Sequence, residues 1–229
     1  MAADLKPAQA ADREAALRAD EADAASRAWW RRVPHVLTRP ASVFEALRET
    51  DEVDVAARSE PVLAITILAG TAGVLLAPAW GTVMDDGSVD TIVLVVVTFI
   101  AGLIYGAAGY LLLGLAVWLG AKAVGIDPPS RIARQLVGFA LLPFALSLVV
   151  LVPAIVIGFG EDWFRTGGSD EGAAAAAVIG VGLAFAAWSF ALVAIGLRTT
   201  LRLPWQGVAG ALGLATVLVA AFVVVPSVL

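Results

Sequence analysis

Five long runs of residues without a single charged side chain constrain the fold of this chain more than any other feature. They follow one another from residue 61 to the end of the chain, and each has at least 24 residues: 61–84, 91–121, 135–160, 172–197 and 203–229. About 20 apolar residues let a helix cross the ~30 Å hydrocarbon core of a bilayer, so each run can cross once. Because backbone polar groups find no water partner in hydrocarbon, these runs are expected to be helices.

The distribution of charge supports this interpretation. The first 60 residues hold 9 of the 15 Lys and Arg and 12 of the 20 Asp and Glu, although only 15% of the whole chain is charged. The remaining residues carry too few charges to surround a water-soluble core. The sequence therefore predicts an all-α fold, a polytopic membrane helical bundle with five transmembrane helices at about 61–84, 91–121, 135–160, 172–197 and 203–227.

The positive residues in the short loops predict the orientation. With the N-terminus inside, 14 of the 15 Lys and Arg lie on the inner side and only Arg165 lies outside. Such asymmetry places the positive side in the cytoplasm. We expect a cytoplasmic N-terminus and a C-terminus outside.

Two segments precede the first run. Residues 1–26 consist mainly of Ala, Asp, Glu and Arg and lack an apolar stripe, so a disordered or transiently helical acidic tail is expected. Residues 27–60 form a juxtamembrane segment, in which a short amphipathic helix is expected to begin at Pro40. Residues 61–229 form the five-helix transmembrane domain.

The juxtamembrane segment is basic and aromatic, which suits a headgroup interface. Either its short helix lies on the membrane surface or it is a stub packed on the helix bundle. The candidate membrane-surface contacts are Trp29, Trp30, Arg31, Arg32, Arg39, Phe44 and Arg48.

The sequence offers no catalytic, cofactor-binding or metal-binding set. There is no cysteine, and the five runs contain no acid–base pair. His35 is the single histidine and stands among arginines, which favours a solvated interface residue over a pH sensor. The acidic stretch 85–90 is expected to be a solvated turn, and Ser169 has no histidine to activate it. The net charge of −5 disfavours nucleic acid as a partner.

Prolines and glycines mark positions of special backbone geometry in two of the runs. Pro143 and Pro153 are expected to kink the third span, although a broken helix that forms a transport site is the alternative. Gly102 and Gly106 are four residues apart in the second span and are expected to let another helix approach closely.

Several short motifs together resemble the Yip1 domain family in its bacterial form, over about residues 34–227. They are Pro40-Ala-Ser-Val-Phe44, Val117-Trp118-Leu-Gly120-Ala-Lys122 and Arg134-Gln-Leu-Val-Gly138-Phe-Ala-Leu-Leu-Pro143. The resemblance implies five spans and a cytoplasmic N-terminus, with no catalytic residues to transfer. Eukaryotic relatives act in vesicle traffic with Rab-type GTPases. The Ala- and Val-rich composition of this chain favours the plasma membrane of a bacterial cell, so that partner is not expected here.

We therefore expect a non-enzymatic membrane scaffold or organiser, or a membrane-homeostasis factor. The alternative is a small-solute or lipid transporter with its site at the third span. The expected partner is the lipid bilayer, with other membrane proteins or further copies of the chain as open possibilities.

Overall fold

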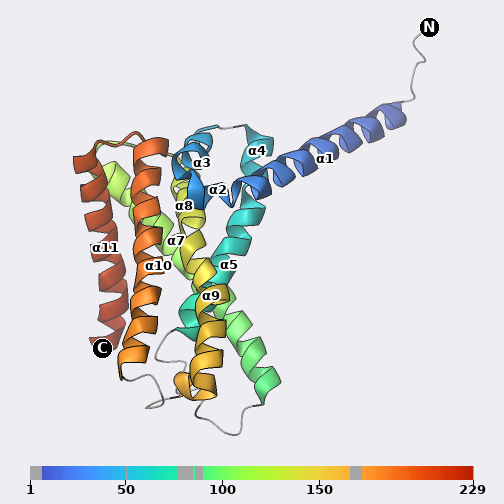
Figure 1. Cartoon of the computed structure of the whole chain (residues 1–229). Helices are drawn as coiled ribbons and strands as arrows, with labels where there is room; N and C mark the ends of the chain where they lie inside the picture. Colours follow the sequence, from blue (N-terminus) through green and yellow to red (C-terminus); the bar gives the residue numbers. More distant parts are fainter. Residues whose placement is uncertain (1–6, 50, 77–84, 86–89, 166–171, 229) are drawn as a thin grey trace.

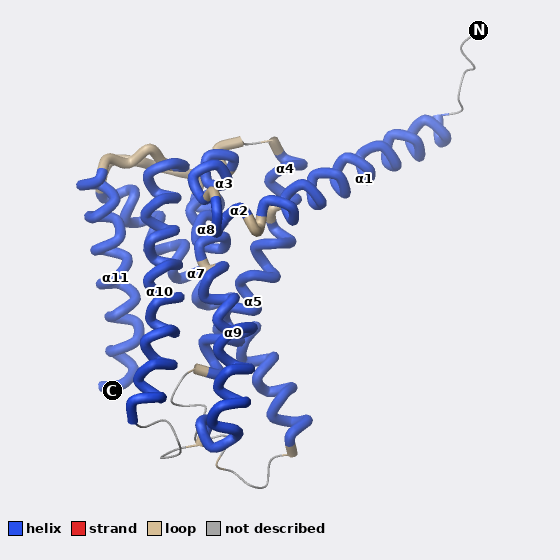
Figure 2. Tube along the Cα trace, viewed as in Figure 1, coloured by secondary structure: helices blue, strands red, loops and turns tan. Residues whose placement is uncertain are grey.

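The fold was analysed in a computed structural model, which describes residues 7–49, 51–76, 85, 90–165 and 172–228. Every regular element in these residues is helical (Figure 2). Four helices precede the first apolar run: α1 (Pro7–Arg32), α2 (His35–Thr38), α3 (Pro40–Ala46) and α4 (Glu52–Ala57). The bundle itself contains α5 (Ser59–Leu75), α7 (Thr91–Ala123), α8 (Ser130–Ala140), α9 (Leu142–Phe159), α10 (Gly172–Thr200) and α11 (Trp205–Val228), with a 3-10 turn at Gly160–Phe164.

Four stretches within the described residues are long and apolar enough to cross a membrane. They are Glu52–Leu75, Ile92–Ala123, Ser130–Phe159 and Gly172–Thr200, and they match the first four predicted spans. The end of the first predicted span lies outside the described residues. The fifth predicted span coincides with α11, which is helical but is not among these four, so the fifth crossing and the orientation remain predictions.

The long helices run back and forth along one bundle (Figure 1). Helices α2, α3 and α4 gather at one end of it, which we call the α3 end, and α11 runs from this end toward the other. Many large apolar side chains point outward, including Ile92, Phe99, Ile104 and Ile157, which is 86% exposed. Such a surface is suited to contact with lipid hydrocarbon rather than with water.

Close packing between α5 and α7 depends on small residues. A Cβ atom placed on Gly70 would lie 2.1 Å from the carbonyl oxygen of Gly102 and 2.4 Å from the backbone nitrogen of Gly106. A Cβ on Gly106 would lie 2.4 Å from the carbonyl oxygen of Thr66. Gly102 and Gly106 thus bring two backbones of the same chain together, as small residues do in membrane helix pairs.

The third predicted span consists of two helical segments that meet at Leu141, whose own N–H and carbonyl oxygen form helical hydrogen bonds with Val137 and Ala145. Helix α8 ends at Ala140, and α9 begins at Leu142, with Pro143 in its first turn. Proline is tolerated there because the first turn of a helix has no acceptor for its N–H. Pro153 lies inside α9, which continues through it, and its side chain is exposed.

The described part of the N-terminal stretch, for which a disordered or transiently helical tail was expected, is helical. From Pro7 onward it is one helix, which projects away from the bundle (Figure 1). Alanine favours helix, and two ion pairs at i, i+4 spacing, Glu14–Arg18 at 2.6 Å and Asp23–Arg27 at 2.5 Å, add to its stability. The composition change at Arg27 does not end this helix, which continues to Arg32.

Candidate functional site

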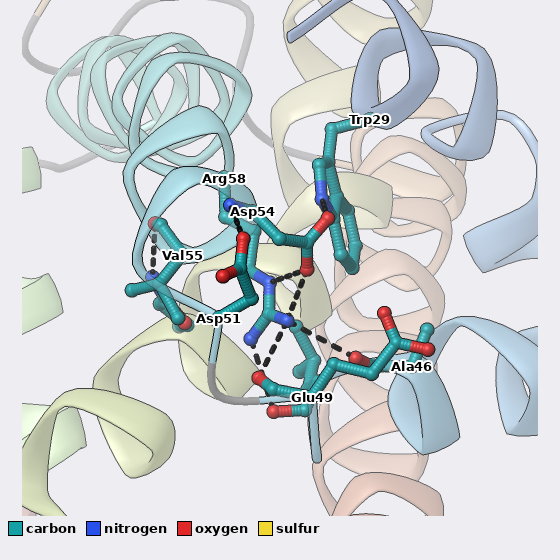
Figure 3. Close-up of polar contacts among 9 residues, drawn as sticks. Trp29, Ala46, Glu49, Asp51, Asp54, Val55 and Arg58 are labelled. Carbon is teal, nitrogen blue, oxygen red and sulfur yellow. Dashed lines mark hydrogen bonds and ion pairs between the residues drawn. The ribbon is translucent and has the colours of Figure 1, made fainter. Parts of the chain in front are cut away.

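A buried arginine organises the α3 end of the bundle. Arg58, between α4 and α5, is fully buried, and its Nε donates to Oδ2 of Asp54 at 3.2 Å (Figure 3). Its Nη2 also pairs with the same carboxylate oxygen. Burying a charge is costly unless it is paired and hydrogen-bonded, and Arg58 meets both conditions.

The same guanidinium closes the C-terminal end of α3. Nη1 donates to the carbonyl oxygen of Leu47 at 3.0 Å, and Nη2 donates to those of Ala46 at 3.2 Å and Glu49 at 2.8 Å. The last carbonyls of a helix have no partner within it and carry partial negative charge. Arg58 therefore connects α3 to the start of α5.

Trp29 connects α1 to this arginine. Its indole Nε1 donates to Oδ1 of Asp54 at 2.7 Å, and its ring lies 5.5 Å from that of Phe139, centroid to centroid. The guanidinium carbons of Arg32 and Arg58 lie 4.6 and 4.8 Å from the centroid of the indole, within the range of cation–π attraction. Trp29, Asp54 and Arg58, which we call the anchor cluster, thus join α1, α4 and the start of α5 into one layer.

The structure corrects two of the predicted membrane-surface contacts. Trp29 and Phe44 are both fully buried inside the protein and have no surface left for lipid headgroups. Trp29 fills the space beside Phe139. Phe44 belongs to the α3 face that packs on α10, where Thr200 donates from its hydroxyl to the carbonyl oxygen of Phe44 at 2.6 Å.

The other predicted contacts remain accessible. Trp30 is 40% exposed, Arg31, Arg39 and Arg48 are exposed, and Arg32 is half-buried. Their contact with a membrane stays a prediction. The expected amphipathic helix is α3, whose apolar residues Val43 and Phe44 face the protein, as in the packed-stub alternative.

An apolar cavity lies deeper in the bundle, beside the junction of α8 and α9. Its volume is about 460 Å³, and residues from five helices line it: Leu113, Val117, Val137, Ala140, Leu141, Phe144, Ala186, Ser189, Phe190, Val193, Leu212, Ala215 and Thr216. Among the described lining residues, Ser189 and Thr216 are the ones with polar side chains. The cavity is therefore a place for an apolar group.

Ser189 completes the first turn of α9. The backbone N–H of Phe144 donates to its Oγ at 3.2 Å, across from α10. The orphan N–H groups at a helix start need such an acceptor where no water is present. This hydrogen bond between α9 and α10 holds the cavity wall next to Pro143 in place.

The chemistry available at both places is limited. Both carboxylate oxygens of Asp54 are engaged in the anchor cluster, and no ionisable side chain is found among the described residues that line the cavity. In the described residues no group of three or more His, Asp and Glu is placed to hold a metal ion. Residues 86–89 of the acidic turn, together with Ser169, lie outside the described part. The arrangement supports anchoring and apolar binding.

Comparison with known proteins decides the family. The model of the Yip1 domain matches residues 35–226. The chain belongs to the Yip1 domain family. It is a multi-pass membrane protein, and this family is not known as a family of enzymes. No curated protein and no solved structure matches the chain.

The Yip1 domain match begins just after α1. Trp29 therefore lies outside the matched domain, whereas its partners Asp54, Arg58 and Phe139 lie within it. Sequence reasoning missed this cluster. The available signal was Asp54 and Arg58 at i, i+4 spacing directly before the first apolar run, which indicates an ion pair on one helix face.

Proposed function

We propose that this chain is a non-enzymatic organiser of a bacterial plasma membrane, with α1 presented on the cytoplasmic side. The observation that carries the proposal is the burial of Trp29, which fixes the C-terminal end of α1, its root, to the bundle. Residues 13–24 of the same helix are exposed throughout. A rigidly rooted, exposed helix is suited to holding other components at a fixed place on the membrane.

The composition of α1 supports a role in contacts with proteins. Its exposed part is rich in charges of both signs, and it precedes the Yip1 domain match. The positive side chains in the loops favour the cytoplasm for this end of the bundle. An acidic and basic helix in water interacts through charge complementarity rather than through apolar burial.

The test compares the full chain with a variant that lacks residues 1–26. This deletion keeps the anchor cluster, so we expect the same yield in the membrane fraction and the same thermal stability. Quantitative purification from native membranes after cross-linking should recover proteins with the full chain that the shortened chain does not retain. An identical set of co-purified proteins would contradict the organiser role of α1.

The alternative function is transport of a small solute or lipid, and one observation favours it. The cavity lies beside the junction of α8 and α9 and close to Pro143, and interrupted helices are places where transporters bind their solutes. The lining argues against polar solutes, because they would lose hydrogen bonds to water without replacement. Uptake of ions or metabolites into vesicles that contain the protein would support transport, and we expect none.

A further inference from the structure

We propose that the cavity beside Leu141 binds an acyl chain of an anionic phospholipid from the leaflet at the α3 end. The inference goes beyond the organiser role and does not depend on it. It starts from the size of the cavity, about 460 Å³, which lies within the ~300–1,000 Å³ range of protein ligand sites.

The polar atoms of the lining select for an apolar occupant. The Ser189 hydroxyl accepts the N–H of Phe144 at 3.2 Å, and the Thr216 hydroxyl donates to the carbonyl oxygen of Leu212 at 2.8 Å. Both hydroxyls are thus engaged within the protein. A hydrocarbon chain needs no hydrogen bonds, whereas a polar ligand would find few here.

The cavity communicates with the outer surface of the bundle. Phe190 belongs to its lining and is 50% exposed, and Ala186 and Thr216 are also exposed. The outer surface nearby is apolar, with Leu183 66% exposed on the same helix. In a membrane protein such an opening faces lipid hydrocarbon, so the nearest apolar molecules are acyl chains.

The position of the cavity along the bundle indicates that its lipid comes from the leaflet at the α3 end. Val117, Val137 and Val193 are lining residues that lie five, three and five positions from Lys122, Arg134 and Arg198, respectively. At about 1.5 Å per residue these cations lie only about 5–8 Å further along their helices, toward the α3 end.

The same cations indicate the charge of the headgroup. Arg134 lies one turn before the lining residue Val137 on α8, and a Cβ on Gly114, which follows the lining residue Leu113 on α7, would be 2.4 Å from its Cγ. Lys122 and Arg198 are exposed and lie over the rings of Trp118 and Trp205, respectively. A phospholipid with its chain in the cavity would place its headgroup near these three cations, of which Lys122 also pairs with Asp127 at 3.4 Å, and cations near the membrane surface attract anionic headgroups.

The test uses phosphatidylglycerol that carries a photoreactive diazirine in one acyl chain. The full-length protein is reconstituted into phosphatidylcholine vesicles that contain a small share of this probe, illuminated, and mapped by mass spectrometry. The cavity-filling variant is Ala186→Phe. Its matched control is Ala187→Phe, one position along the same helix and also exposed, but not part of the lining.

We expect labelling of lining residues in the wild type and in Ala187→Phe, and a loss of about tenfold in Ala186→Phe. Unlabelled phosphatidylglycerol should compete with the probe on the wild type more strongly than phosphatidylcholine does. This competition does not depend on how well a variant folds. Equal labelling of the lining in the two variants would overturn the acyl-chain site, and equal competition by the two lipids would overturn its preference for anionic lipid.

Discussion

The indole nitrogen of Trp29 donates a 2.7 Å hydrogen bond to the carboxylate of Asp54, which links the end of α1 to the helix that leads into the first membrane span. The same carboxylate pairs with the buried Arg58, so one acid holds two partners from different elements. These two contacts of Asp54 fix the C-terminal end of α1 to the bundle. Because each contact can be removed by a single substitution, its contribution to the stability of the protein can be measured.

Replacing Trp29 with Phe removes the indole donor and keeps an aromatic ring beside Phe139. One oxygen of Asp54 then loses its partner, so we expect a loss of about 1–3 kcal/mol in stability. Thermal unfolding of the purified protein in detergent measures the effect. Trp30→Phe is the matched control, since this neighbouring ring is exposed, and its effect should stay within about 0.5 kcal/mol. Equal effects of the two substitutions would show that the indole hydrogen bond contributes nothing.

Replacing Arg58 with Met removes the charge and keeps much of the side-chain volume. Oδ2 of Asp54 and the three carbonyl oxygens at the end of α3 and just after it then lose the Arg58 donor, and breaking such a buried pair costs about 3–5 kcal/mol. Arg48→Met serves as the control, because Arg48 is exposed. Chemical unfolding that shows the same midpoint for both variants would contradict the central place of Arg58.

Replacing Gly70 with Ala tests the close approach of α5 and α7. The new Cβ would meet the backbone of Gly102 and Gly106, so the helices must separate, at a cost of about 1–3 kcal/mol. Gly109→Ala is the control on α7, where nothing lies within 4 Å of the added atom. There the better helix propensity of Ala should leave stability unchanged or raise it by up to about 1 kcal/mol. A tolerated Gly70→Ala would exclude this packing.

Replacing the two prolines should give opposite results. Pro153→Ala restores a hydrogen bond inside α9 at an exposed position and should raise the melting temperature in detergent. Pro143→Ala favours a continuous helix across Leu141, which disturbs the bond between Phe144 and Ser189, and it should lower that temperature. In neither case do we expect a shift by ions or metabolites that depends on the proline. One reproducible, proline-dependent shift by such a solute would favour the transport alternative.

The long helices could be predicted from the sequence because lipid leaves the backbone no alternative. Runs such as 91–121 and 172–197 appear in the structure as α7 and α10, with ends within a few residues of the charges that bound them. Gly102 and Gly106 were also identifiable, since a spacing of four places both on one face of a helix.

The anchor cluster could not be predicted in the same way. An indole among arginines has the composition of a membrane interface, and only the fold reveals that Phe139, far along the chain, lies beside it. For residues 7–26 the alanine content predicted helix propensity, whereas the lack of an apolar stripe argued against a fixed helix. Here Trp29 fixes only the root, and alanine propensity and ion pairs support the rest.

The sidedness of the two termini tests the account most directly, because an organiser that presents α1 to the cytoplasm requires it. Reporters active on only one side of the membrane are fused at Ala2 and at Leu229, in separate full-length proteins. The 14-to-1 distribution of Lys and Arg predicts a cytoplasmic signal at Ala2 and an external signal at Leu229. Signals from the same side at both positions would contradict five crossings, and an external signal at Ala2 would contradict the proposed role of α1.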